Sequence, residues 1–158
     1  LRKLLDILNS KLDIINYSRS KENYEKINLE KYELFNYEYD KFRNSVLVSF
    51  APIWSLCKFL ENFSEKNPED FSLINSIILC SSSSVVTKRY SFNKYDKNLS
   101  NKLLESENKI IGITNKFKIP CIIIQPTMIY GAIGEYKDEN INKIINIMRR
   151  SPLLIIPK

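Results

Sequence analysis

The stretch PCIIIQPTMIYG, residues 120–131, decides the fold. Its four consecutive apolar residues, Cys121–Ile124, lie between two prolines and predict a strand buried on both faces, as in the centre of a parallel sheet covered by helices. Pro126 cannot donate a backbone hydrogen bond, so the strand is expected to end there. Ligands bind at the carboxyl ends of such strands, so residues 127–131 are the first candidate for a site.

The rest of the chain alternates between helical and strand-like patterns. Because strand and helix alternate, the sequence predicts an α/β fold with a doubly wound parallel sheet in one domain, residues 1–158. The segment 85–96 is expected to be a loop. The expected helices cover residues 1–10, 53–63, 99–117 and 141–148, and the expected strands cover 12–17, 32–37, 45–50, 76–80, 121–125 and 153–156.

Composition excludes several classes of function. The chain has 158 residues, of which 44% are apolar and 27% charged, as in a folded globular domain. Its net charge of +6 is dispersed, with no basic run longer than Arg149-Arg150, so nucleic acid is not the expected partner. Three cysteines without a CxxC pair, and no histidine, argue against a metal site and for reduced thiols in a cytoplasmic protein. No apolar stretch approaches the ~18 residues of a membrane span, so no membrane is expected either.

Several motifs resemble one known family. Residues 125–131 resemble the RPTxIYG stretch of extended and atypical short-chain dehydrogenase/reductases, which include nucleotide-sugar epimerases and dehydratases. The resemblance covers most of the chain and is specific from about residue 76 onward. It implies a Rossmann-type sheet and an NAD(P)-dependent oxidoreductase or epimerase that transfers hydride on a nucleotide-linked sugar. An atypical subgroup of this family shares further features with the chain. They are the serine run 81–84, Thr87-Lys88, Leu103-Leu104, Glu107 and residues 140–150.

The chain also departs from the family pattern. The family's glycine-rich GxxGxxG turn, which lets the backbone approach the cofactor pyrophosphate, is missing, and the chain has three glycines in all. Residues 1–10 resemble the helix that follows this turn, so the chain is expected to be a fragment whose first strand is missing. Gln125 stands where the family has an arginine, which removes a positive charge near the site.

The resemblance assigns four parts of the chain to the cofactor. Hydroxyl and basic residues after the second family strand suit the 2′-phosphate, so NADP is favoured over NAD, although a solvated turn would look the same. The proline-containing turn after residue 49 fits a contact with the cofactor and an ordinary strand-to-helix connection equally well. The expected cofactor residues are Tyr17, Ser18 and Arg19 at the adenine end, Phe50, Ala51 and Pro52 beside adenine and ribose, Thr127, Met128 and Ile129 at the nicotinamide end, and Ser82 and Pro126.

Catalysis in the family requires a serine or threonine and a tyrosine–lysine pair four residues apart. Ser83 falls on the serine position, where it would orient the substrate. The helix places Leu99 and Leu103 at the tyrosine and lysine positions, and neither can move a proton. Tyr90 and Lys94 have the required spacing but lie nine residues earlier, so they are either the catalytic pair or part of an exposed loop.

Glu107 interrupts the apolar stripe of the long helix. A buried carboxylate must be paired, hydrogen-bonded or protonated. Either its stem packs while its head reaches water, or it anchors the strand-end loops around Thr127 or Tyr130.

Three interpretations of the whole chain remain open. The first is an oxidoreductase or epimerase with a nucleotide sugar as its substrate. The sequence does not decide whether this enzyme forms a homodimer. The second is a non-catalytic Rossmann-like module for binding or assembly, consistent with the missing tyrosine–lysine pair. The third is an inactive fragment, in which the loss of a central strand exposes sheet edges.

Overall fold

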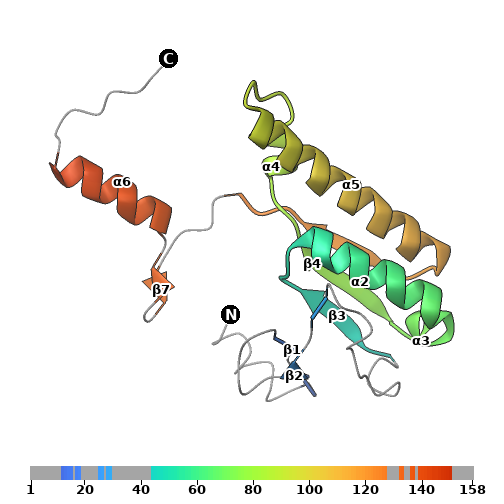
Figure 1. The fold of residues 1–158 in the computed structure, drawn as a ribbon. Helices are drawn as coiled ribbons and strands as arrows, with labels where there is room; N and C mark the ends of the chain where they lie inside the picture. The colour runs from blue at the N-terminus through green and yellow to red at the C-terminus, as the bar shows by residue number, and fades with distance from the viewer. Residues whose placement is uncertain are drawn as a thin grey trace. The chain divides into compact units, whose positions relative to one another are not determined.

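The computed structural model describes residues 12–15, 17–18, 25–26, 28–29, 44–127, 132–133, 136–137 and 139–150 (Figure 1). The chain forms two compact units, Leu1–Gln125 and Pro126–Lys158, and each is described separately.

The first unit contains an open parallel sheet of three strands. The strands are β3 (Val46–Ser49), β4 (Ser76–Cys80) and β5 (Cys121–Ile124), in the order β3-β4-β5. Leu47 pairs with Ile77, and Ile77 pairs in turn with Cys121 on the other side. The expected α/β class is therefore confirmed. A separate short parallel pair joins β1 (Tyr17–Ser18) to β2 (Glu25–Lys26).

Four helices lie between these three strands in the sequence. They are α2 (Ile53–Lys66), α3 (Pro68–Ser72), α4 (Ser84–Thr87) and α5 (Lys94–Lys116). Pro52 precedes the first turn of α2, where its fixed φ suits a helix start, and Pro68 opens α3. The side chain of Asn93 caps α5 by accepting a hydrogen bond from the backbone N–H of Tyr95 at 2.9 Å.

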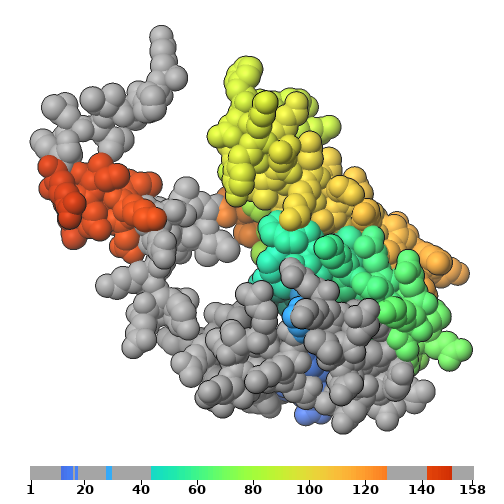
Figure 2. Space-filling view, viewed as in Figure 1, coloured from blue at the N-terminus to red at the C-terminus, as the bar shows by residue number. Residues whose placement is uncertain are grey.

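The two long helices, α2 and α5, pack side by side on one face of the sheet (Figures 1 and 2). Their apolar stripes meet the strand residues that alternate toward them, such as Ile77 and Leu79, which are fully buried. An aromatic cluster forms part of this core. Its ring centroids are 5.9 Å apart for Phe59–Phe63, 5.4 Å for Phe63–Phe71 and 4.9 Å for Phe71–Phe117.

On the opposite face of the sheet, several of the described strand residues are exposed. Val46, Val48, Ile122 and Ile124 point away from the helices, and Ile122 remains 58% exposed. The expectation that 121–124 is buried on both faces at the centre of the sheet is therefore wrong for the described residues, in which β4 is central and β5 lies at an edge. Along the chain, each strand is added on the same side of the one before it. Two right-handed crossovers in this order place both long helices on the same face of the sheet.

Two further expectations need correction. Residues 85–96 are not a loop throughout, because α4 occupies Ser84–Thr87 and α5 already begins at Lys94. Buried Ser100 on α5 donates a hydrogen bond of 2.8 Å to the Val85 carbonyl and joins the two helices. Residues 12–15 are not a strand, whereas Tyr17–Ser18 pair with β2. The expected helix at 1–10 and strands at 32–37 and 153–156 lie outside the described residues.

The second unit contains a two-stranded antiparallel ribbon and a helix. The ribbon pairs β6 (Ala132–Ile133) with β7 (Tyr136–Lys137), and the helix α6 (Glu139–Arg150) includes the expected segment 141–148. In the described part of the chain, no helix combines the length and the apolar character that crossing a membrane requires.

Candidate functional site

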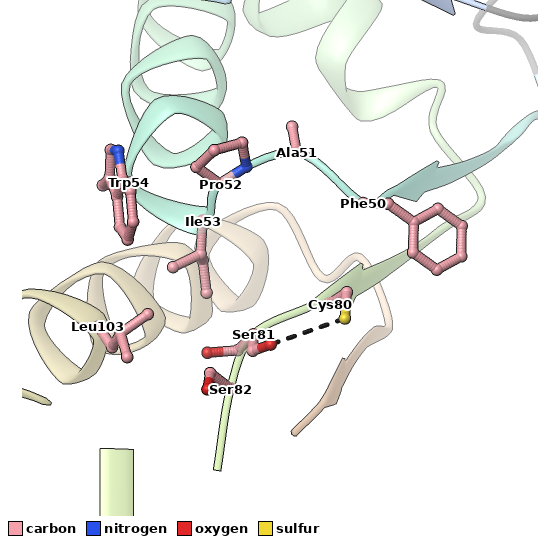
Figure 3. Close-up of a pocket in the computed structure, with 9 residues that line it drawn as sticks. All are labelled: Phe50, Ala51, Pro52, Ile53, Trp54, Cys80, Ser81, Ser82 and Leu103. Carbon is pink, nitrogen blue, oxygen red and sulfur yellow. Dashed lines mark hydrogen bonds between the residues drawn. The ribbon is translucent and has the colours of Figure 1, made fainter. Parts of the chain in front are cut away.

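A pocket of about 270 Å³ opens at the carboxyl ends of β3 and β4 (Figure 3). The turn after β3, the start of α2, the end of β4 and one residue of α5 form its walls. The lining residues are Phe50, Ala51, Pro52, Ile53, Trp54, Cys80, Ser81, Ser82 and Leu103.

Local sequence explains why the turn after β3 faces the pocket. Ala51 donates its backbone N–H to the Ser49 hydroxyl at 3.3 Å, which bends the chain directly after the strand. The Pro52 carbonyl then accepts the N–H groups of Ser55 at 2.9 Å and Leu56 at 3.1 Å, so α2 begins at once. The amino end of a 14-residue helix therefore borders the pocket.

Trp54 gives the pocket an aromatic wall (Figure 3). The ammonium of Lys102, on α5, lies 4.2 Å from the centroid of the indole ring, a cation–π contact. Leu103, the neighbour of Lys102, is buried and contributes the adjoining apolar surface. Trp54 and Leu103 thus form an aromatic and aliphatic wall, with one positive charge against the indole ring.

A buried carboxylate connects the pocket to the sheet. Glu107 on α5 is 6% exposed, and Oε1 accepts a hydrogen bond from the Ser81 hydroxyl. The Gln125 side-chain nitrogen, at the end of β5, donates to both carboxylate oxygens at 2.9 Å. Within the described residues no lysine or arginine pairs with Glu107. Neutral donors from two strand ends therefore satisfy the carboxylate.

This geometry decides between the two expectations for Glu107. The carboxylate does not reach water, so the solvated-head interpretation is wrong. It does anchor strand ends, but through Ser81 and Gln125 instead of Thr127, while Tyr130 lies outside the described residues. Burial explains the difference, because a carboxylate out of water takes the nearest donors.

The serine run after β4 forms a hydrogen-bonded turn. Ser82 donates its hydroxyl to Ser84 Oγ at 3.1 Å and accepts the Ser84 N–H at 3.2 Å. Ser83 precedes α4, and its carbonyl accepts the N–H of Thr87 at 3.0 Å. Ser82 lines the pocket, whereas Ser83 lies next to it in the chain without lining it.

Tyr90 lies in the α4–α5 connection and Lys94 at the start of α5, and neither lines the pocket. Tyr90 is 83% exposed, with the Arg89 guanidinium 5.6 Å from its ring centroid. Lys94 is the first residue of α5 and is exposed. Their catalytic assignment stays a prediction.

The remaining expected cofactor residues lie in three places. Tyr17 and Ser18 form β1, with Tyr17 packed against the core. Pro126 and Thr127 begin the second unit. Arg19, Met128 and Ile129 lie outside the described residues.

The pocket therefore brings together four expected residues, Phe50, Ala51, Pro52 and Ser82, and five that sequence reasoning missed. Ser81 could have been found, because it directly follows a buried strand. Trp54 carried no signal in the sequence, and Leu103 was noted only through the family resemblance, at the lysine position and in the pair Leu103-Leu104. In the described part of the chain no three histidine, cysteine, aspartate or glutamate side chains cluster as a metal site would require.

Comparison with protein-family models, with curated proteins and with solved structures found no match. Function must therefore be argued from the pocket itself.

Proposed function

We propose that this pocket holds part of an NAD(P) cofactor, that the fold is of the Rossmann type, and that the protein is an oxidoreductase or epimerase acting on a nucleotide-linked sugar. One observation carries the proposal: the pocket lies at the carboxyl ends of adjacent parallel strands, where α/β sheets bind nucleotides. The sequence motifs support the finer assignment to the short-chain dehydrogenase/reductase type.

The size and lining of the pocket support a ring-shaped ligand group. Its volume of about 270 Å³ is below the roughly 300–1,000 Å³ typical of sites that enclose a whole small molecule. It therefore suits one ring or nucleoside of a dinucleotide. Trp54, Ile53 and Leu103 offer apolar contact to a flat ring, and Ser81 and Ser82 offer hydrogen bonds.

Titration calorimetry of the full chain with NADPH and with NADH tests the binding. We expect saturable heat with both and tighter binding of NADPH, because Ser18 and Arg19 suit the 2′-phosphate. Ala51→Trp fills the pocket and is expected to abolish binding. Lys58→Trp adds the same ring at an exposed position of α2 and is the matched control. Binding that survives Ala51→Trp would place the cofactor elsewhere, and no heat with either dinucleotide would remove the proposal.

A non-catalytic binding module is the second candidate function. Leu99 and Leu103 stand where the family's proton-transferring pair is expected, and Leu103 is buried in the pocket wall. Turnover of a panel of nucleotide sugars separates the two. The enzyme hypothesis expects turnover that Ser83→Ala abolishes, with Tyr90→Phe testing whether Tyr90 takes part. Saturable cofactor binding without turnover of any sugar would favour the module.

A further inference from the structure

We infer that the Ser81 side chain acts in this pocket as a hydrogen-bond acceptor, and that the pocket therefore selects a flat ring with an amino group at its edge. This inference rests on the proposed function, because the ring in question belongs to the NAD(P) cofactor. Two parts of that cofactor carry the required chemistry, the 6-amino group of adenine and the carboxamide of nicotinamide.

The proton of Ser81 is committed to Glu107. A serine hydroxyl has one hydrogen and two lone pairs, and an ionised carboxylate can only accept. The Ser81 hydroxyl donates to Glu107 Oε1, while Gln125 holds both carboxylate oxygens in place from the other strand end. The hydrogen of Ser81 therefore points at the carboxylate, and its lone pairs remain for the pocket.

Burial keeps this arrangement fixed. Glu107 is 6% exposed, so water does not replace a donor that turns away. If the Ser81 hydrogen turned away, Gln125 would be the one described side-chain donor left to this buried carboxylate, and the loss of a hydrogen bond to a buried charged group costs more free energy than an ordinary hydrogen bond returns. Ser81 is accordingly not free to rotate its hydrogen toward a ligand.

The Ser82 hydroxyl and the Cys80 thiol also give their hydrogens to partners within the chain. Ser82 donates its hydroxyl to Ser84 Oγ, and the Cys80 thiol donates to the Ser81 carbonyl at 3.6 Å. The indole nitrogen of Trp54 lies on the side of its ring away from Ser81 (Figure 3). A ligand edge that faces Ser81 must therefore bring its own hydrogen, and an apolar wall beside it favours a ring over a sugar.

Calorimetry with three dinucleotides tests the inference and distinguishes the two sources. They are natural NADP, the hypoxanthine analogue, in which oxygen replaces the adenine amino group, and the 3-acetylpyridine analogue, in which methyl replaces the carboxamide amino group. We expect one analogue to bind the wild-type chain about tenfold more weakly than NADP, the upper range for one hydrogen bond. In Ser81→Ala this discrimination should shrink to about twofold or less. Ser81→Thr retains the hydroxyl and should retain the discrimination.

Ser64→Ala is the matched control, because this serine donates to the Glu61 carbonyl on α2 and does not line the pocket. Glu107→Gln provides an independent variant should Ser81→Ala fail to fold. Its amide nitrogen can donate to Ser81, which releases the serine hydrogen toward the ligand and should reduce the preference for the amino group. Equal binding of all three dinucleotides, or discrimination that persists in Ser81→Ala, overturns the inference. Absence of any binding overturns the proposed function and this inference with it.

Discussion

Glu107 is a carboxylate that lies in the interior and takes its hydrogen bonds from a hydroxyl and an amide. Removing a charge from water is costly, and bonds from neutral donors offset this cost without a second buried charge. Gln125 provides the geometry for this, since one amide nitrogen reaches both oxygens.

Glu107→Ala is expected to lower the free energy of unfolding by about 2–4 kcal/mol, because it leaves a cavity and two unpaired donors. Urea denaturation measures the effect. Glu105→Ala on the same helix removes an exposed carboxylate that pairs with Lys109 at 3.2 Å, and should change stability by about 0.5 kcal/mol or less. Equal losses in both variants would show that the buried network contributes nothing.

Cys57 is a buried thiol whose pKa is raised to about 11, first by burial and then by the nearby Glu61 carboxylate. The folded chain therefore holds this proton more tightly than the unfolded chain, so the contribution to stability is complete below about pH 9 and declines as the pH rises toward 11. We expect the free energy of unfolding of the wild type to fall more between pH 8.5 and pH 10.5 (about the span of this titration) than that of Cys57→Ala. Parallel pH profiles of the two proteins would contradict this.

At the scale of elements, α5 begins at a side-chain cap. Asn93 accepts the N–H of Tyr95, so Asn93→Ala should destabilise the chain by about 1 kcal/mol. Asn98→Ala changes the same residue type inside α5, at an exposed position, and should be neutral or slightly stabilising. Thermal unfolding followed by circular dichroism compares them, and a loss in Asn98→Ala as large as in Asn93→Ala would show that capping is not the cause.

Most core elements of the first unit were predictable from the sequence. The strands at 46–49, 76–80 and 121–124 and the helices α2 and α5 follow from short apolar runs and helical spacing. The run CIII does not indicate which face of β5 the helices cover, because the covered face depends on the direction of the crossovers. The early start of α5 was missed because its first turn, KYDK, is polar and presents no apolar stripe.

The candidate site was predictable in part for a related reason. The turn 50–52 and Ser82 follow directly from strand ends, which the sequence locates well. Ser81 follows a strand end too, but its hydrogen bond to Glu107, a residue 26 positions away, is a contact that no local pattern encodes.

At the scale of the whole molecule, the exposed strand residues on one face of the described sheet are the most unusual feature of the first unit. Parallel sheets are normally covered on both sides, and here Val46, Val48, Ile122 and Ile124 stay exposed. Val48→Lys should therefore leave stability within about 0.5 kcal/mol and reduce binding of a hydrophobic dye such as ANS. Leu47→Lys, one residue earlier on the side facing the helices, should unfold the unit. Dye fluorescence with urea denaturation measures both, and equal effects of the two substitutions would contradict the described faces.

The chain has a single tryptophan, Trp54, and it stands in the pocket wall with the Lys102 ammonium against its ring. The tryptophan emission of this protein, excited at a wavelength that its nine tyrosines do not absorb, therefore reports on one place. Entry of a ring beside Trp54 should quench that emission, and a bound reduced nicotinamide should accept the excitation energy of the indole. The wild-type chain therefore needs no attached label to show that its pocket is occupied.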